Sequence, residues 1–198
     1  PAAMTIMLAI GVNKMARRHA IIRRMPAVET LGSTTVICSD KTGTLTQNQM
    51  TVLEVCANDV CYEFSGVGYV PVGTVTLNGI LLEMSKHSSL TECLKAGMLC
   101  NDSRLVENGK QWAIEGDPTE AALISAAVKG GMSPEILEQE FPRVDALAFE
   151  SQHQYMATLH HQGVTSIIYV KGSAESVLSR CQYVYSDKGE FEPIDHER

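Results

Sequence analysis

The stretch ICSDKTGTLTQNQM (residues 37–50) separates two kinds of sequence. Before it, residues 28–38 rise into an apolar, β-branched run that predicts a strand. After it come short alternating runs and turn residues, which indicate several further strands. The stretch itself places an acid, a base and three threonines within residues 40–46, directly after the predicted strand. Ligands of open α/β sheets bind at the carboxyl ends of strands, so this loop is the first candidate site.

The residue types in this loop suit phosphoryl transfer. A carboxylate such as Asp40 can attack a phosphoryl group and become an aspartyl phosphate. Lys41 would neutralise phosphoryl oxygens, and Gly43 would let backbone N–H groups approach them. Thr42 and Thr44 would donate further hydrogen bonds. Because phosphoryl transfer depends on positioning and charge, Mg²⁺ is expected, with Asp40 as its first ligand. The alternative is an ordinary capped turn without chemistry.

Composition describes a folded, acidic chain. The 198 residues are 44% hydrophobic and 20% charged, which is ordinary for a globular protein. Five of the 16 basic residues precede the first acid, Glu29, so the part from Met25 onward carries a formal charge of −12. That charge argues against a nucleic-acid-binding body, because polyanions bind to basic surfaces.

The cysteines and the paired histidines indicate no metal site. The chain has six cysteines without a CxxC pair, and most of them have apolar neighbours. This pattern favours buried thiols over disulfide bonds or a zinc site. His160 and His161 precede Gln162 and Gly163 between two apolar runs, so they are predicted on the surface of a turn.

Residues 1–12 carry no charge and lead into a basic segment. The run is shorter than the ~20 residues that cross a bilayer. The basic cluster follows the apolar run instead of preceding it, unlike the arrangement in a signal peptide. Two alternatives remain from the residues alone: a buried helix start, or the end of a membrane helix that enters a basic cytoplasmic segment.

Capping signals predict the helices of the second part. Residues 88–101 place apolar side chains on one helical face, and Ser89 and Glu92 have the spacing of a capping box. Another helix follows Asp117, which takes the N-cap position with Glu120 three residues later. Two shorter helices are predicted to begin at Ser133 and Ser173.

Period-two runs predict the strands. They occupy residues 51–57, 60–64, 69–77, 79–84, 144–149, 155–160 and 164–170. Asn78–Gly79 and Asn108–Gly109 are tight-turn signals, and the second predicts a hairpin over residues 104–114. Sequential strands with interspersed helices and short hairpins predict a mostly antiparallel α+β domain.

Three motifs carry a resemblance to a known family. DKTGTLT (40–46) is identical to the phosphorylation-site signature of the P-type ATPases, the ion pumps that cycle through an aspartyl phosphate. GDPTEAAL (116–123) resembles a nucleotide-domain motif of the branch that includes calcium and sodium/potassium pumps. YVKGSAESVLSRC (169–181) resembles the KGA motif of the same domain. The chain therefore resembles a P-type cation ATPase of the calcium-type branch.

The resemblance implies a domain plan. Residues 1–12 would be the cytoplasmic end of the fourth transmembrane helix, which settles the alternatives for that run. Residues 13–47 would form the stalk and the start of an α/β, haloacid-dehalogenase-like phosphorylation domain. Residues 48–198 would be an α+β nucleotide-binding domain, an antiparallel sheet flanked by helices.

The resemblance also implies roles for residues far from the loop. Phe149 matches the aromatic that stacks on adenine, Glu120 the acid near the adenine amino group, and Lys171 with Gly172 the lining of the nucleotide pocket. Each has an ordinary alternative as a core residue, a capping partner or a strand end. Residues 152–154 read Gln-His-Gln where many relatives carry fixed positive charge, which leaves the nucleotide affinity open.

The implied function is that of an ATP-driven cation pump. ATP and Mg²⁺ would be its cofactors, Asp40 and Thr42 the metal ligands, and Asp40 the acceptor of the γ-phosphate. The whole protein would be a multi-pass membrane protein with this segment on the cytoplasmic side. Its partners would be the actuator domain, the rest of the phosphorylation domain and the transmembrane helices, without nucleic acid. The chain alone is expected to bind ATP without sustained turnover.

Two other functions are compatible with the residues. One is an aspartyl-nucleophile phosphatase of the haloacid-dehalogenase class. Such enzymes typically carry a second aspartate two residues after the nucleophile, where this chain has Thr42. The other is a non-catalytic nucleotide-binding module. The absence of a GxxxxGK[ST] pattern argues against a P-loop nucleotide site.

Overall fold

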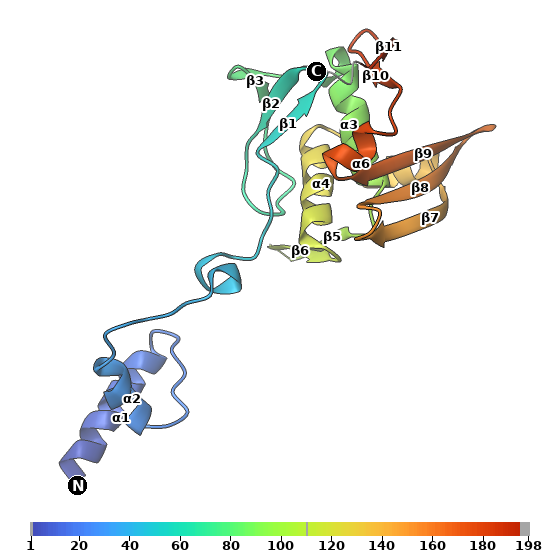
Figure 1. Cartoon of the computed structure of the whole chain (residues 1–198). Helices are drawn as coiled ribbons and strands as arrows, with labels where there is room; N and C mark the ends of the chain where they lie inside the picture. The colour runs from blue at the N-terminus through green and yellow to red at the C-terminus, as the bar shows by residue number, and fades with distance from the viewer. Residues whose placement is uncertain (1, 110, 195–198) are drawn as a thin grey trace. The chain divides into compact units, whose positions relative to one another are not determined.

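The computed structural model describes residues 2–109 and 111–194, which form two compact units, Pro1–Gln47 and Asn48–Arg198 (Figure 1). The first unit contains helix α1 (Ala2–Ala16), helix α2 (Pro26–Gly32) and a turn of helix at Lys41–Leu45. α1 buries none of its residues. Within the described ranges, every helix is too short or too polar to cross a membrane.

The strand predicted over residues 28–38 is wrong. The first part of this segment lies in α2, which has Pro26 in its first turn, and the part that follows is exposed and outside any strand. Proline at the first helical position favours a helix start. A single strand needs partners for its backbone hydrogen bonds, and the first unit offers no described strand to pair with it.

The second unit begins with an antiparallel sheet of four strands in sequential order. Its strands are β1 (Glu54–Ala57), β2 (Val60–Phe64), β3 (Val75–Leu77) and β4 (Ile80–Leu81). Asn78 and Gly79 join β3 to β4 with positive φ angles of 52° and 76°, as the tight-turn signal predicts.

Helices and a second sheet follow. The elements are a short 3₁₀ turn (Met84–Lys86), α3 (Ser88–Leu99), β5 (Arg104–Asn108), β6 (Gln111–Glu115), α4 (Pro118–Lys129), α5 (Pro134–Glu140), β7 (Arg143–Glu150), β8 (Tyr155–Gln162), β9 (Thr165–Gly172), α6 (Ala174–Leu178), β10 (Tyr183–Tyr185) and β11 (Phe191–Pro193). β5 and β6 form the hairpin predicted through Asn108–Gly109. β7, β8 and β9 form an antiparallel sheet with β8 in the centre. The predicted mixed α+β fold with antiparallel sheets is confirmed.

α3 is central to the core of the second unit. It contacts α4, β1 of the first sheet and β9 of the second (Figure 1). Leu90, Leu94 and Met98 recur at helical spacing on its buried face. The sheets bring alternate residues to the same core, including Tyr62 on β2 and Met156 on β8. This burial of apolar area is the main stabilising term of the unit.

The capping box predicted for α3 is wrong. The N-cap residue is His87, without a side-chain cap, and the Ser89 N–H donates instead to Asp187 Oδ1 at 3.0 Å. Glu92 turns toward Lys95, with which it forms an ion pair. A carboxylate from the loop between β10 and β11 therefore does the capping that sequence spacing assigned to local residues.

The histidine and cysteine predictions also need correction. His160 is 2% exposed on β8, with Nδ1 2.8 Å from the Phe141 carbonyl oxygen and Nε2 2.9 Å from Thr158 Oγ1. Alternation along β8 turns it into the core, which the turn prediction overlooked. Cys56 and Cys61 form a disulfide, because they are directly opposite on neighbouring strands. Of the other cysteines, Cys38 and Cys93 are exposed and Cys100 is buried.

Candidate functional site

Glu120 and Lys171 form an ion pair at one end of the sheet formed by β7, β8 and β9. Lys171 Nζ donates to Glu120 Oε1 at 2.7 Å, and the two side chains are only 22% and 16% exposed. Glu120 lies in the first turn of α4, and Lys171 is the penultimate residue of β9. The pair joins elements that are 51 residues apart in sequence.

A loop after α3 holds the other carboxylate oxygen of Glu120. Its Oε2 accepts from the Asp102 N–H and from Ser103 Oγ, both at 3.0 Å. Asn101 Nδ2 donates to the Glu120 carbonyl oxygen at 2.9 Å, and Asn101 Oδ1 accepts from the Ser103 N–H at 2.9 Å. The loop therefore fixes both the backbone and the side chain of Glu120. These three residues could not be predicted as part of the site from the sequence, because nothing in their own spacing indicates a contact with α4.

Asp117 caps α4 as predicted. Its Oδ1 accepts from the Thr119 N–H at 2.8 Å and from the Glu120 N–H at 3.2 Å. The hydrogen bond from the Glu120 N–H is the main cause that lowers the pKa of Asp117, with the Thr119 bonds in the same direction and burial opposing them. The Asp117 N–H donates in turn to Ser103 Oγ at 2.8 Å. The cap and the loop thus set the position of Glu120 together.

Phe149 lies in the same cross-strand row as Lys171. Leu147 pairs with Ala157 and Glu150 with Tyr155, so a bulge leaves Ala148 and Phe149 opposite Met156 alone. Met156 pairs on its other side with Lys171. Two strand spacings of ~4.8 Å put the Phe149 and Lys171 backbones ~10 Å apart. Bulges re-aim side chains and are common beside active sites. The Phe149 side chain is 59% exposed, so its ring is available to a ligand.

Gly172 permits a close approach between the end of β9 and the start of β8. A Cβ atom at Gly172 would lie 2.3 Å from the Gln154 carbonyl oxygen and 2.6 Å from the Tyr155 Cβ. The Ser173 N–H donates to the same Gln154 carbonyl at 2.8 Å. Only a residue without a side chain fits at this position. The glycine therefore lets the end of β9, which carries Lys171, lie directly against the start of β8.

The segment between Phe149 and β8 carries few fixed charges. His153 Nε2 lies 3.5 Å from Glu150 Oε2, and both side chains are more than half exposed. Gln154 has a positive φ of 57°, and its Oε1 accepts from Ser173 Oγ at 3.3 Å. Arg180 lies over the Tyr155 ring, with Cζ 4.7 Å from the centroid. Arg180 is thus a further cation near this end of the sheet, which no motif in the sequence indicates.

The DKTGTLT loop forms a wide turn in the first unit. The Thr46 N–H donates to the Lys41 carbonyl oxygen at 3.1 Å, and Gly43, with a φ of 74°, donates its N–H to Thr46 Oγ1 at 3.3 Å. Asp40 precedes the turn in extended conformation, and the whole loop from Asp40 to Thr46 is exposed. The carboxylate of Asp40 is therefore accessible to solvent and to a reagent.

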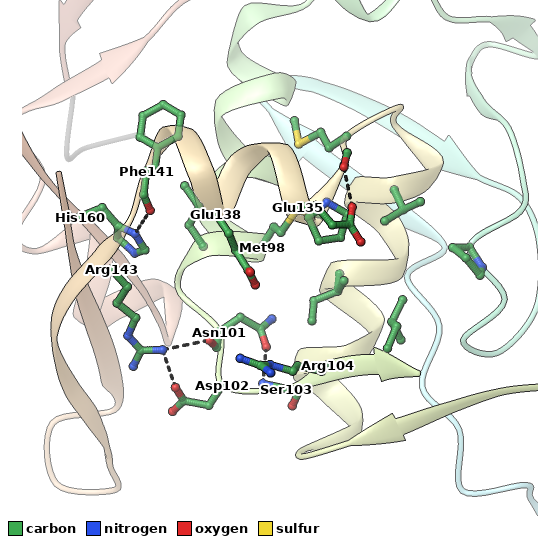
Figure 2. Close-up of a pocket in the computed structure, with 18 of the residues that line it drawn as sticks. Met98, Asn101, Asp102, Ser103, Arg104, Glu135, Glu138, Phe141, Arg143 and His160 are labelled. Atoms are coloured by element: carbon green, nitrogen blue, oxygen red, sulfur yellow. Dashed lines mark hydrogen bonds and ion pairs between the residues drawn. The ribbon is translucent and has the colours of Figure 1, made fainter. Parts of the chain in front are cut away.

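A hollow of about 940 Å³ in the second unit lies beside the loop that holds Glu120. Its walls come from the end of α3, from β5, α4 and α5, and from the start of β7. Figure 2 shows Arg143 reaching Asp102 Oδ1 at 2.7 Å and the Asn101 carbonyl oxygen at 3.2 Å. Glu120, Phe149 and Lys171 are not part of its lining. Arg143 lines this hollow, and its hydrogen bonds tie β7 to the loop that holds Glu120.

Taken together, the site offers a paired carboxylate and ammonium, an exposed aromatic ring and a tight backbone turn at one sheet end. Each carboxylate oxygen has two lone pairs, so Glu120 Oε1 can accept a further hydrogen bond beside that from Lys171. An exposed ring can stack on a planar ligand. The arrangement suits a flat heterocycle that carries an amino donor and a negatively charged substituent.

Comparisons with known proteins agree on one family. Residues 89–198 match the family described as P-type ATPase, cytoplasmic domain N. The "Cation-transporting ATPase pma1" of Synechocystis sp. is 53% identical over 201 residues, which cover 98% of this chain and 22% of that protein. The "Probable cation-transporting ATPase F" of Mycobacterium tuberculosis is 45% identical over 196 residues, which cover 98% and 22%. The "Calcium-transporting ATPase" of Bacillus subtilis is 38% identical over 188 residues, which cover 94% and 21%.

The chain thus spans about a fifth of the length of these relatives. The family match covers most of the unit in which Glu120, Phe149 and Lys171 lie. The relatives align over nearly all of the chain, including the DKTGTLT loop. The chain therefore belongs to the P-type cation-transporting ATPases and contains the region of their cytoplasmic, nucleotide-binding N domain.

Proposed function

We propose that residues 48–198 bind ATP at the sheet end that carries Glu120, Phe149, Lys171 and Gly172. The adenine ring stacks on Phe149, and its amino group donates to Glu120. Lys171 faces the nucleotide from the end of β9. The observation that carries the proposal is the Glu120–Lys171 ion pair of 2.7 Å, in which Lys171 shares a cross-strand row with the exposed residue Phe149.

The charges of the pocket support a nucleotide as the ligand. Without nucleotide, the Lys171 ammonium is neutralised by Glu120 in a site that is mostly shielded from water. An anionic substituent can share the ammonium, since lysine has three donors. Glu120 keeps its position meanwhile, because Asp102 and Ser103 continue to donate to its other oxygen. Stacking removes water from a ring that is 59% exposed, which adds affinity.

In the whole pump, Asp40 accepts the γ-phosphate of the bound ATP. A carboxylate oxygen of Asp40 forms a bond to the γ-phosphorus, the bond from that phosphorus to the bridging oxygen breaks, and ADP leaves with the electron pair. Lys41 and the backbone N–H groups around Gly43 hold the transferred oxygens, assisted by the Thr42 and Thr44 hydroxyls.

The oxygen atoms of this loop fit magnesium. Asp40 and Thr42 supply hard oxygen donors, both on exposed residues, which is the ligand type that Mg²⁺ prefers. When bound, Mg²⁺ supplies positive charge that neutralises phosphate oxygens.

The domain plan of the proposal follows the two units. Residues 48–198 form the nucleotide-binding domain, residues 13–47 the stalk and the start of a haloacid-dehalogenase-like phosphorylation domain, and residues 1–12 the cytoplasmic end of a transmembrane helix. The division of the chain at Gln47 supports this plan. The partners are the actuator domain, the rest of the phosphorylation domain and the membrane helices of a multi-pass cation pump, with calcium as a candidate ion. The chain alone binds ATP but does not sustain turnover.

The test is a titration of the isotope-labelled chain with ATP, with and without Mg²⁺, followed by backbone NMR. We expect shifts at Glu120, Phe149, Lys171 and their neighbours, and weaker binding by Phe149→Ala and by Lys171→Ala. Loss of a stacked ring costs ~1 kcal/mol or more, which is at least about fivefold in affinity.

Matched variants separate site effects from general ones. Phe191→Ala removes an exposed ring outside the site, and Lys86→Ala removes a lysine from a surface ion pair with Glu83. Both should bind ATP like the unmodified chain. No binding at millimolar ATP, or equal losses in all four variants, would contradict the proposal. Steady ATPase activity of the pure chain would contradict the expectation of no turnover.

A further inference from the structure

The outer face of the β1–β2 hairpin carries two cysteines and two glutamates. Cys56 lies directly opposite Cys61, and Glu54 lies opposite Glu63. All four residues are exposed, whereas Tyr62, which lies between Cys61 and Glu63 on β2, points into the core. Alternation along both strands therefore gathers two sulfur atoms and two carboxylates on one face. The nucleotide site uses none of these residues.

Three of the four side chains converge. The ligand atoms of Glu54, Cys56 and Cys61 lie within 4.8 Å of one another. Glu54 Oε1 is 3.4 Å from Cys56 Sγ, and the two cysteines are bonded as a disulfide with their Cα atoms 4.0 Å apart. Glu63 is held differently, because Thr76 Oγ1 donates to its Oε2 at 3.2 Å. The hairpin fixes the backbone of the group, so its convergence does not depend on a flexible loop.

We propose that Cys56, Cys61 and Glu54 are a redox-controlled site for a thiophilic divalent cation such as Zn²⁺. With the disulfide reduced, two thiolates and one carboxylate bind the cation, and water completes the coordination. Zinc takes sulfur and carboxylate ligands in tetrahedral geometry, and a site with three protein ligands keeps one position for water. The two thiolates and the carboxylate carry three negative charges against the two positive charges of Zn²⁺. This excess favours binding of the cation at an exposed position.

The backbone geometry allows this coordination. Zinc–sulfur bonds of about 2.3 Å at a tetrahedral angle separate two sulfurs by roughly 3.8 Å. Directly opposite cysteines reach that separation by rotation about Cα–Cβ once the sulfur–sulfur bond is broken. The carboxylate of Glu54 is already on the same face, two residues before Cys56. A disulfide sulfur carries no thiolate charge, so the oxidised pair is not a ligand for the cation.

The two states interconvert by thiol–disulfide exchange with a small disulfide such as oxidised glutathione. One cysteine thiolate attacks the glutathione disulfide and releases one glutathione thiolate, which leaves a mixed disulfide. The thiolate of the second cysteine attacks the cysteine sulfur of this mixed disulfide and releases the other glutathione as a thiolate. The sulfur–sulfur bond of the reagent breaks, that between Cys56 and Cys61 forms, and two electrons pass to the two glutathiones. A bound cation must leave before the pair can oxidise.

The test is a titration of the reduced full chain with Cd²⁺, followed by the ultraviolet charge-transfer absorption of thiolate-bound cadmium. Zn²⁺ affinity is then measured by competition with a chromophoric chelator. Cys56→Ser and Cys61→Ser should each abolish tight binding. Glu54→Gln should weaken it by about tenfold or more, since even residues outside the ligand set often cost that much.

Two matched variants decide whether the assigned residues act as ligands. Glu63→Gln removes the same charge from the same face, and Cys93→Ser removes an exposed cysteine elsewhere. Both should bind Cd²⁺ like the unmodified chain. The proposal is overturned if Glu63→Gln costs as much as Glu54→Gln, or if Cys93→Ser removes the absorption.

The redox half of the proposal has its own readout. Treatment of the cadmium-free chain with oxidised glutathione should convert the thiols of Cys56 and Cys61 into a disulfide, as read by peptide mapping, and abolish the Cd²⁺ signal. A reductant should restore both. Full Cd²⁺ binding after oxidation of the pair would contradict the proposal, as would peptide mapping that finds no disulfide between Cys56 and Cys61.

Discussion

Glu120 is the residue at which three parts of the second unit meet. It belongs to the first turn of α4, its carboxylate is paired with Lys171 of β9, and its other oxygen is held by the loop after α3. Any one of these contacts would be unremarkable for a first-turn glutamate. Their combination makes the side chain both a structural tie and a wall of the candidate site, so its removal should affect stability and ligand binding together.

Glu120→Ala should destabilise the chain by ~2 kcal/mol. The change leaves Lys171 without its partner in a largely shielded position and removes an acceptor of the hydroxyl of Ser103, a buried residue. An unsatisfied buried donor costs ~1–3 kcal/mol. Urea unfolding followed by circular dichroism measures the difference. Glu83→Ala breaks a pair whose side chains are 64% and 71% exposed, and it should cost less than ~1 kcal/mol. Equal costs would show that the shielded pair is no stronger than a surface pair.

Gly172→Ala and Gly97→Ala should change stability in opposite directions. A methyl group at Gly172 would lie 2.3 Å from the Gln154 carbonyl oxygen, so we expect a loss of ~1–3 kcal/mol. At Gly97, inside α3, the new atom would meet Leu123 at an ordinary 3.6 Å, and alanine should stabilise the helix by up to ~1 kcal/mol. Thermal unfolding of both variants checks the signs. A neutral Gly172→Ala would mean that the sheet end adapts, and that the close approach is not required.

At the scale of elements, α3 depends on a distant carboxylate. Asp187 accepts from the Ser89 N–H at the helix start and from the Ser89 hydroxyl, and its Oδ2 lies 3.9 Å from His87 Nδ1. Tyr62 donates to or accepts from the same histidine at 3.0 Å. The start of the central helix is therefore tied to β2 and to the loop after β10. The segment up to β11 should be needed for a stable α3.

Asp187→Asn should lower stability by ~1 kcal/mol at neutral pH, because the neutral amide is a weaker acceptor at a helix start. Burial raises the pKa of Asp187, but the hydrogen bonds from Ser89 outweigh it and hold the pKa below its usual 3.8. A lowered pKa means that the contribution is fully present above about pH 4 and is lost as pH falls through the folded-state value. Unfolding free energies from pH 7 downward measure this. If the unfolding free energies of the unmodified chain and of Asp187→Asn differ by the same amount down to the lowest pH, the Asp187 carboxylate is not the group that stabilises the start of α3.

At the scale of the whole molecule, the hydrophobic core lies in one of the two units. Its buried members run from Tyr62 to Tyr169, and the partly buried residues packed against them begin at Val52. In the described part of the first unit, large apolar side chains such as Ile6, Met7 and Ile37 are exposed. Since burial of apolar area is the main source of stability, nearly all of it should reside in residues 48–198.

A chain truncated to residues 48–198 should therefore unfold at the same urea midpoint as the full chain. Its free energy of unfolding should also decrease with urea concentration at the same slope. The slope depends on the surface that unfolding exposes, so a cooperative unit that lies within 48–198 should keep its slope. If the proposed site is right, the truncated chain should also keep the ATP affinity of the full chain. A lower midpoint would show that the first 47 residues stabilise the second unit.

Local signals predicted several elements correctly. Asp117 caps α4, Ser133 caps α5 and Asn–Gly pairs close two hairpins, because each of these signals acts within three or four residues. The errors concern residues whose partners are far away in sequence. The strand at residues 28–38 has no sheet, the cap of α3 comes from Asp187, and His160 faces the core instead of solvent.

The sequence by itself determined the family, through DKTGTLT, GDPTEAAL and the motif around Lys171, and with it the expectation of a nucleotide site. It also determined the α+β class, because capping residues and hydrophobic periodicity are properties of short segments. Only the tertiary structure decided that Lys171 meets Glu120, that a bulge puts Phe149 in the cross-strand row of Lys171, and that Cys56 faces Cys61. These contacts depend on strand register and on how helices close over a sheet. Such long-range pairings are selected by the packing of the whole core, and no short segment contains them.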